Sequence, residues 1–300
     1  MPKFDVTLLT SRDFLSAAEG DEFAEIILEE DRLLTIALEK RGLTVTRTNW
    51  DNPKFDWAET KCVVFRTPWD YFNRYDEFAP WFEKTSKVTK FINSAEIINW
   101  NIDKHYMLEL ESAGINIPPT VFIEPGDKRQ LTEITAELNW DEFILKPAIS
   151  GGAWHTYRMN STNIAEHEAL FAELVKDKSM LVQEYQNSIL NEGEVSYMVF
   201  GGKFTHAILK KGKTGDFRVQ ENFGGTIHGY HPSQEEINFA QLVVEKAKPG
   251  IVYARVDVMR DNSGKLSLGE LEVFEPALWL RKYPPAAELF AGLITELLPG

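Results

Sequence analysis

The sequence predicts a mixed fold, with a parallel α/β domain at the N-terminus and an α+β region after it. In the first part of the chain, strand and helix patterns alternate, which is typical of a parallel α/β unit. After the Pro118-Pro119 pair, short strand patterns alternate with glycine turns, so a simple doubly wound sheet is not expected there. We therefore expect a domain boundary near residue 115.

Hydrophobic periodicity predicts the N-terminal elements. Apolar residues at helical spacing predict a helix over Glu22–Lys40, and Gly42 is a natural stop. One helix, or two, is expected over residues 93–114. Strands are expected at Phe4–Thr10, Leu43–Arg47 and Cys62–Arg66, with a further strand to follow.

The region after the boundary is predicted to be rich in strands. Helical patterns cover Ile164–Lys176 and Gln234–Lys246. Strands are expected at Thr120–Ile123, Glu142–Lys146, Met180–Tyr185, Glu194–Phe200, Lys203–Leu209, Ile251–Arg260 and Lys265–Phe274. Short strands with two intervening helices indicate an α+β arrangement.

Length, charge and cysteine content limit the classes of protein. The 300 residues give room for two or three compact units. A formal net charge of -14 argues against nucleic acid or an anionic membrane as partner, although a local basic pocket could still bind an anionic substrate. Cys62 is the only cysteine, so a reducing compartment is expected. Without a long apolar run or a signal-peptide pattern, we expect a cytoplasmic protein.

An acidic hairpin is predicted near the C-terminus. The strand patterns Ile251–Arg260 and Lys265–Phe274 flank the turn Asp261–Gly264. If Arg260 pairs with Lys265, the register of the whole hairpin follows from side-chain alternation. A bulge would change this register.

In that register, three carboxylates converge on one face. Asp257 would lie opposite Leu268 and diagonal to Glu270, at about 7–8 Å between backbones, and Glu272 shares their face. Such a cluster costs free energy unless a cation occupies it, and Mg²⁺ prefers hard oxygen ligands. The alternative is an exposed strand face on which Arg255, opposite Glu270, pairs one of the acids.

A glycine loop follows a strand that ends in a lysine. Lys146 precedes Ser150-Gly151-Gly152, and adjacent glycines let backbone N–H groups approach an anion closely. Lys104, before a helical stretch, could add a second cation. A hairpin turn and a surface lysine are the alternatives, because neither segment matches a standard phosphate loop.

Further segments could contact a nucleotide. Gln183, Glu184 and Tyr185 end a strand and begin a connector, where an exposed backbone could bind an adenine edge. Glu194 could accept hydrogen bonds from ribose hydroxyls. A buried strand and an exposed acid are the alternatives for these two segments.

In the segment that follows, cationic residues precede a glycine pair. Lys210 ends a strand, and Arg218 could bind a carboxylate or phosphoryl group with two donors. Asn222 and the pair Gly224-Gly225 come next. A surface salt bridge is the alternative for Arg218.

Taken in order, these segments resemble the ATP-grasp superfamily, and most closely its prokaryotic glutathione synthetase-like branch. The resemblance covers the chain from about Lys104 to Pro276. Its best match is Glu270-Leu-Glu-Val-Phe-Glu-Pro276 with Asp257 upstream, where Glu272 replaces the asparagine of such synthetases. The N-terminal segments Val64–Tyr71 and Asn93-Ser94 look like the pre-ATP-grasp domain of relatives that include the O-ureido-serine cyclo-ligase.

The resemblance implies three domains and a role for each candidate. It implies a pre-ATP-grasp domain at 1–115, a lid subdomain at 116–185 and a C-terminal subdomain with the metal site at 186–300. Asp257, Glu270 and Glu272 would hold metal, and Lys210 and Arg218 would stabilise the transferring group. Arg66, Asn222, Gly224 and Gly225 would belong to the substrate site, while His155 receives no role. ATP would be bound by Lys104, Lys146, Ser150, Gly151, Gly152, Gln183, Glu184, Tyr185 and Glu194.

The implied activity is ATP-dependent carboxylate–amine ligation through an acylphosphate, with ADP as product. The implied cofactors are ATP and Mg²⁺, with Mn²⁺ as an alternative, and the substrates are small amino acids or peptides. A homo-oligomer is compatible with such enzymes. A small-molecule kinase on the same scaffold and a non-catalytic ATP-binding module are the competing functions.

Overall fold

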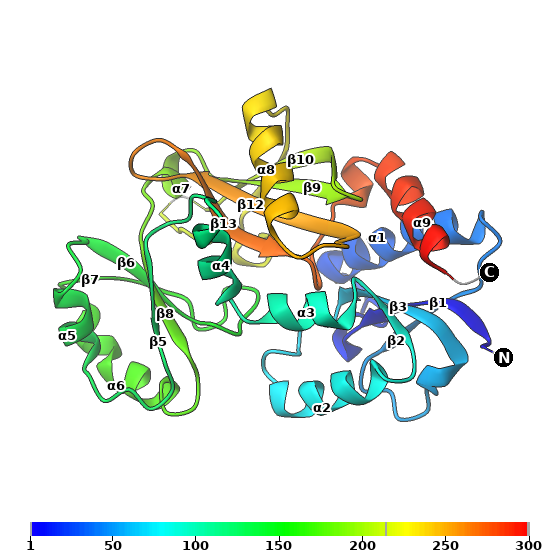
Figure 1. Ribbon diagram of the computed structural model, residues 1–300, viewed down its shortest axis with the longest axis horizontal. Coiled ribbons are helices and arrows are strands. Elements are labelled where there is room, and N and C mark those ends of the chain that lie inside the picture. Colours follow the sequence, from blue (N-terminus) through cyan, green and yellow to red (C-terminus); the bar gives the residue numbers. More distant parts are fainter. Residues whose placement is uncertain (1, 214, 299–300) are drawn as a thin grey trace.

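Three β-sheets organise the chain in the computed structural model (Figure 1), which describes residues 2–213 and 215–298. Two sheets have four strands and the third has five. In Figure 1 the N-terminal sheet is blue to cyan, the second is green, and the third runs from yellow-green to orange. The predicted class, α/β followed by α+β, is confirmed.

The N-terminal sheet is parallel and has the order β2-β1-β3-β4. Parallel neighbours require crossover connections, which helices supply here. The sequence patterns did not predict the helix over Tyr75–Thr85. The strands are β1 (Phe4–Thr10), β2 (Val45–Asn49), β3 (Thr60–Thr67) and β4 (Lys90–Ile92), and the helices are α1 (Glu22–Glu39), α2 (Tyr75–Thr85) and α3 (Ala95–Ile102).

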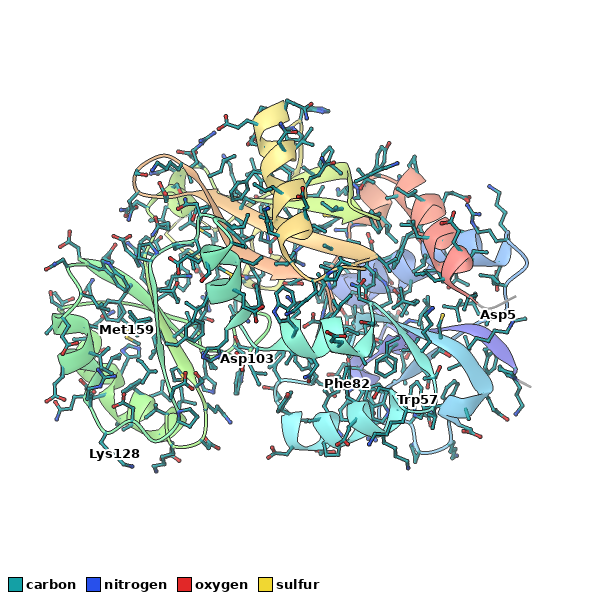
Figure 2. All side chains as sticks on the ribbon, in the orientation of Figure 1. Asp5, Trp57, Phe82, Asp103, Lys128 and Met159 are labelled. Carbon is teal, nitrogen blue, oxygen red and sulfur yellow. The ribbon has the colours of Figure 1, made fainter. Side chains whose placement is uncertain are left out.

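The second sheet is antiparallel, with the order β5-β8-β6-β7. Alternate residues of β6 point into a core that two helices cover, and Met159, labelled in Figure 2, belongs to this core. Lys146 lies near the C-terminal end of β6. The elements are β5 (Thr120–Ile123), α5 (Leu131–Ala136), β6 (Glu142–Pro147), β7 (Tyr157–Asn160), α6 (Ile164–Leu174) and β8 (Met180–Glu184).

The third sheet is antiparallel, with the order β11-β10-β9-β12-β13. Its strands are β9 (Glu194–Phe200), β10 (Lys203–Lys211), β11 (Thr226–Tyr230), β12 (Tyr253–Arg260) and β13 (Leu266–Glu272). The helices α4 (Tyr106–Ser112), α7 (Ser188–Asn191), α8 (Gln234–Lys246) and α9 (Pro285–Leu297) complete the chain. Within the described ranges, no helix is both long enough and apolar enough to cross a membrane.

The two faces of the third sheet differ in chemistry. Along β12, Ala254, Val256 and Val258 pack against α8 and α4 in one core. On the opposite face, Tyr253 joins a second core with α9 and α1, while Arg255 and Asp257 line a cavity. Because side chains alternate along a strand, one face of β12 packs entirely against apolar residues. The opposite face packs against apolar residues at Tyr253 and lines the charged cavity at Arg255 and Asp257.

The three sheets lie inside the residue ranges 1–115, 116–185 and 186–300. Packing links these ranges, because α4 contributes to the core of the third sheet and α9 packs on α1. The bounds of the three domains stay a prediction.

Candidate active site

A cavity of about 490 Å³ lies where the three sheets meet, and residues from each sheet line it. Most of the predicted site residues contribute to its wall, although they are far apart in sequence. They are Arg66, Lys104, Lys146, Ser150, Gly151, Gly152, Gln183, Glu184, Tyr185, Glu194, Lys210, Arg218, Asp257, Glu270 and Glu272.

The acidic hairpin forms, but its predicted register is wrong. Arg260 pairs with Leu266 instead of Lys265, and the register shifts between Asp257 and Val258. The extra residue is Gly269, where a Cβ atom would lie 2.5 Å from the Met259 side chain. A bulge at a glycine thus lets β13 approach β12 closely.

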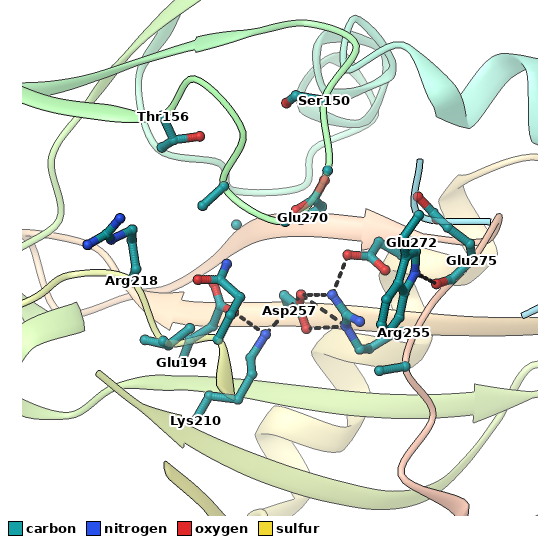
Figure 3. A pocket seen from close by; sticks show the side chains of 18 of the residues that line it. Ser150, Thr156, Glu194, Lys210, Arg218, Arg255, Asp257, Glu270, Glu272 and Glu275 are labelled. Atoms are coloured by element: carbon teal, nitrogen blue, oxygen red, sulfur yellow. Dashed lines mark hydrogen bonds and ion pairs between the residues drawn. The ribbon is translucent and has the colours of Figure 1, made fainter. Parts of the chain in front are cut away.

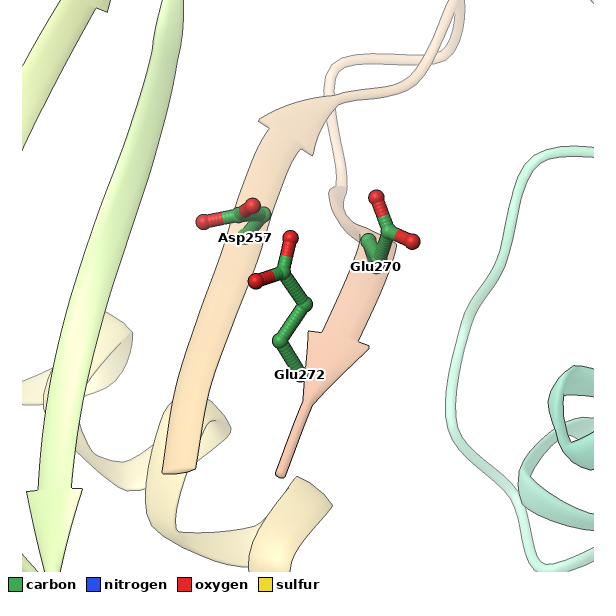
Figure 4. A group of neighbouring side chains, drawn as sticks. All are labelled: Asp257, Glu270 and Glu272. Atoms are coloured by element: carbon green, nitrogen blue, oxygen red, sulfur yellow. The ribbon is translucent and has the colours of Figure 1, made fainter. Parts of the chain in front are cut away.

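The bulge places the three acids together more directly than the predicted register does. Asp257 lies opposite Glu270, and Arg255 lies opposite Glu272. One ligand atom from each of Asp257, Glu270 and Glu272 lies within 4.8 Å of the others (Figure 4). Three hard oxygen donors on one strand pair fit a divalent cation such as Mg²⁺.

Cations of the chain already surround these acids (Figure 3). The Arg255 guanidinium donates to Asp257 at 2.8 Å and also bonds the Glu272 carboxylate. Lys210 Nζ lies 3.2 Å from Asp257 Oδ2 and pairs with Glu194. Arg255 therefore does pair with the acids, as in the alternative interpretation of the sequence, but it does so inside the cavity. The sequence analysis did not include Arg255 among the site residues. The sequence feature that could have identified Arg255 is its two-residue spacing from Asp257, which puts both side chains on one face of the strand.

The charges of the three acids differ. Burial opposes ionisation of Asp257, but Arg255 and Lys210 hold its pKa below the ordinary value. Burial likewise opposes ionisation of Glu270, while the neighbouring lysines lower its pKa. The pKa of Glu272 is raised well above its ordinary value by burial and by the other acids, despite Arg255. A bound divalent cation would favour ionisation of Glu272, because opposite charge stabilises a carboxylate.

Two lysines line the cavity near the acids, and one of them connects the acids to the glycine loop. Lys104 Nζ donates to the Ser150 carbonyl at 2.8 Å and lies 3.1 Å from Glu270 Oε1. Lys146 reaches the cavity from β6, and burial lowers its pKa, with Lys104 acting in the same sense. Both lysines are therefore placed to attract an anion between the second and third sheets.

The loop after β6 has an unusual backbone. Gly152, Ala153 and His155 have positive φ angles of 55°, 60° and 49°. For non-glycine residues such conformations cost free energy and cluster at functional sites. His155 accepts or donates a hydrogen bond with the Tyr157 hydroxyl at 2.8 Å, and its side chain is not part of the described cavity wall.

Gly151 allows this loop to approach the N-terminal domain. A Cβ atom at Gly151 would lie 2.9 Å from the Phe72 ring, so Gly151→Ala is expected to push the loop outward. We expect KM for ATP to rise about tenfold, in line with the cost of overpacking. Steady-state kinetics of the variant measure this effect.

The additional change Phe72→Ala should restore most of the affinity for ATP, because it removes the clash. Gly229→Ala is the matched control, since a Cβ atom there meets nothing within 4 Å. An unchanged KM in Gly151→Ala would contradict the close packing of the loop on Phe72.

The connector after β8 lines part of the cavity. Gln183, Glu184 and Tyr185 all line it, and so does Gln186. The Tyr185 N–H donates to the Glu142 carbonyl at 3.0 Å, and its carbonyl accepts from Asn262 at 3.0 Å. The backbone of Tyr185 is thus engaged within the protein. The backbone of Glu184 is engaged as well, because its N–H donates to the Pro119 carbonyl at 2.9 Å and its carbonyl accepts from Gln186 Nε2 at 2.9 Å.

The predicted substrate loop is only partly in the cavity. Arg218 lines it but forms a two-donor salt bridge with Asp216, at 2.7 Å for the closest contact, and stands apart from Lys210 in Figure 3. Gly224 and Gly225 do not belong to the described wall of the cavity. A Cβ atom at Gly225 would lie 2.2 Å from the Val219 carbonyl, so this glycine is needed for the turn. The side chain of Asn222 lies outside the described residues.

Arg66 is held at the carboxyl end of β3. Its Nε donates to Asp31 Oδ1 at 2.9 Å, and the side chain is 2% exposed. The segment after it packs against the residues that follow β13, because Trp69 Nε1 donates to the Glu275 carbonyl at 3.0 Å and Tyr71 is buried among aromatic rings. The segment therefore forms both a domain contact and part of the cavity wall.

Glu275 is a further acid that sequence reasoning missed. It follows the acidic strand, is 8% exposed and lines the cavity. Burial, with a contribution from Glu270, raises its pKa to about 7. The sequence feature that could have identified Glu275 is its position in the acidic stretch next to Pro276.

The raised pKa of Glu275 predicts a pH dependence of stability. An unfolded glutamate titrates near 4.3, so between about pH 4.3 and 7 the folded state binds more protons and stability falls as pH rises. Glu275→Gln should remove this contribution. With a metal chelator present, the free energy of unfolding of the parent minus that of the variant should decrease by about 3 kcal/mol from pH 4 to pH 8. A difference that stays constant in denaturant titrations across this range would contradict the assignment.

Comparison with known proteins gives matches in two parts of the chain. Residues 6–93 match the family model for the N-terminal domain of D-cycloserine synthetase DcsG, and residues 157–273 match the RimK-like ATP-grasp domain. The cycloserine biosynthesis protein DcsG of Streptomyces lavendulae is 27% identical over 275 residues, covering 86% of this chain and 90% of that protein.

Two further comparisons agree with this similarity. A probable alpha-L-glutamate ligase of Marinomonas sp. (strain MWYL1) is 28% identical over 180 residues, which cover 59% of this chain and 58% of that protein. The crystal structure of D-cycloserine synthetase DcsG superposes with a TM-score of 0.87 at 24% identity, covering 98% of this chain and 99% of that one. The resemblance to the ATP-grasp ligases that the sequence predicts is thus confirmed.

Proposed function

We propose that this protein is an ATP-dependent carboxylate–amine ligase that acts through an acylphosphate on a small amino acid or peptide. The observation that supports this most strongly is the cluster of Asp257, Glu270 and Glu272 with Arg255 and Lys210, facing a glycine loop across a cavity. Phosphoryl transfer depends on positioning and charge neutralisation, and this cluster can supply both.

The residues predicted to bind ATP receive separate roles in nucleotide binding. Lys104 and Lys146 would hold phosphate oxygens, and Ser150, Gly151 and Gly152 would cover the triphosphate. Gln183, Glu184 and Tyr185, with Gln186, would surround the base. Glu194 would accept from ribose, although its pairing with Lys210 also ties it to the charged cluster.

The acids would hold Mg²⁺, or alternatively Mn²⁺, which would neutralise phosphate charge when bound. Lys210 and Arg255 would orient the carboxylate substrate. A carboxylate oxygen would attack the γ-phosphorus and release ADP. The amine would then attack the acyl carbon, and phosphate would leave as the nitrogen loses a proton.

The substrate class rests on similarity to DcsG and to a probable alpha-L-glutamate ligase. Cyclisation of one molecule and ligation of two both fit this chemistry. The buried free thiol of Cys62 is compatible with a reducing compartment such as the cytoplasm. No nucleic acid or membrane partner is proposed, and a homo-oligomer stays a prediction.

A phosphate-release screen tests the proposal. ATP and Mg²⁺ are incubated with single amino acids and with pairs, and both free phosphate and products are measured. ADP and phosphate that appear only with an amine-bearing acceptor, together with a new amide, support ligation. A stable phosphorylated product would instead support the kinase alternative, and ATP binding without turnover for any acceptor would support the non-catalytic module.

A further inference from the structure

The N-terminal domain lines its part of the cavity with apolar side chains. On α1, Phe23, Ile26 and Ile27 lie at helical spacing and all face the cavity. Phe14 and Trp69 join them, and the ring centroids of Phe14 and Trp69 are 5.5 Å apart. We call these five residues the apolar wall.

Hydrogen bonds hold two of the aromatic members of the apolar wall, Phe14 and Trp69. Arg47 donates to the Phe14 carbonyl and is itself paired with Asp31 at 2.6 Å. Trp69 donates to the Glu275 carbonyl, which follows the acidic strand directly. The wall adjoins the charged cluster, as a binding surface for part of a substrate should.

Two acids of α1 next to the apolar wall, Glu30 and Asp31, already have partners within the protein. Glu30 accepts from the N–H groups of Leu280 and Arg281, at 2.6 and 3.1 Å, and from the Arg281 guanidinium at 3.0 Å. Asp31 accepts from Arg47 and Arg66. Neither carboxylate therefore offers a ready site for a substrate cation.

Arg66 has an unused donor. Its Nη1 is buried and has no hydrogen-bond partner within the described part of the chain, and Arg66 lines the cavity. A buried, unpaired donor costs free energy, which an acceptor on a ligand would recover. Arg66 thus offers, beside the apolar wall, an unpaired cationic donor that suits a carboxylate.

We infer that the amine-bearing substrate is an α-amino acid, or the end of a peptide, with an aromatic or branched apolar side chain. This inference rests on the proposed function and names the substrate class. The side chain contacts the apolar wall, the carboxylate that does not react accepts from Arg66, and the amine points toward the charged cluster. A small polar acceptor would leave the wall exposed to water.

The test compares acceptors in the phosphate-release assay. We expect kcat/KM for leucine or phenylalanine to exceed that for glycine, alanine or serine by at least about tenfold. Phe23→Ala should reduce this ratio by about tenfold. Ile36→Ala, which removes an exposed side chain from the same helix, is the matched control and should leave the ratio unchanged.

Arg66 is tested with the same acceptors and with their carboxamides. The parent should prefer the free acid over the amide, and Arg66→Lys should lose this preference, because a lysine cannot pair Asp31 and also offer the guanidinium donor. Equal turnover of acid and amide by the parent would overturn the role of Arg66. Equal or better turnover of small polar acceptors would overturn the apolar specificity.

A binding measurement separates this inference from the proposed function. Calorimetric titration with phenylalanine and with serine, in the presence of ADP and Mg²⁺, does not require turnover. Tighter binding of phenylalanine that Phe23→Ala abolishes supports the inference even if no phosphate is released, in which case the ligase proposal alone fails. Equal binding of the two amino acids overturns the inference even if turnover is observed.

Discussion

Replacing Asp257 with asparagine is expected to lower kcat for ATP-dependent turnover by about 10²–10³-fold or more. Asparagine keeps the shape of the side chain but removes one of the three carboxylates that would hold the metal. It also removes the negative charge that Arg255 and Lys210 share, so both cations would move toward Glu272 and Glu194. Steady-state kinetics over a range of Mg²⁺ concentrations measure the effect, and higher Mg²⁺ should restore only part of the activity.

Asp261→Asn is the matched control for this variant. Asp261 lies in the turn of the same hairpin, outside the described cavity wall, and accepts from the N–H groups of Ser263 and Lys265. Its loss should lower stability with little change in kcat below the melting temperature. Asp257→Asn with kcat within about threefold of the parent would remove the carboxylate cluster from the mechanism.

Arg255→Lys is expected to lower kcat by about 10²-fold or more while leaving KM for ATP nearly unchanged. The guanidinium of Arg255 bonds Asp257 and Glu272 together, which a lysine ammonium cannot reproduce because it lacks the planar fork. If Arg255 orients the carboxylate substrate, its replacement misaligns the reacting groups. Steady-state kinetics with both substrates, together with thermal unfolding, measure the effect.

Arg260→Lys makes the same substitution on the same strand at an exposed position. Arg260 donates to the Gly264 carbonyl in the hairpin turn, and its replacement should leave both kcat and KM close to the parent values. A loss of folding in Arg255→Lys, seen as a lower melting temperature with normal kcat, would assign Arg255 to stability alone.

The sequence predicted most of the fold because its elements have clear periodicity. The strands Phe4–Thr10, Thr120–Ile123 and Glu194–Phe200, and the helix Gln234–Lys246, have the predicted bounds. The pattern did not predict α2, which contains a proline, Pro80. The hairpin register was wrong because a bulge at Gly269 shifts the pairing between Asp257 and Val258, and side-chain alternation alone does not reveal a bulge.

For a similar reason, the sequence predicted some residues of the candidate site and missed others. Asp257, Glu270 and Glu272 could be brought together from strand alternation, which is local and has a fixed period. The part played by Arg255 could not, because the same alternation allowed either a metal site or a salt bridge. The roles of Glu275 and Arg66 depend on burial and on partners such as Trp69 and Asp31, which lie far away in the chain.

The sequence alone determined which chemical groups are available and on which face of each strand they lie. Tertiary structure decided which of them meet: Lys104 with Glu270, Arg66 with Asp31, and the glycine loop with Phe72. The physical reason is that the interactions involved act over different distances along the chain. Backbone periodicity acts over a few residues, whereas the pKa and the partner of a buried charge depend on every element that packs around it.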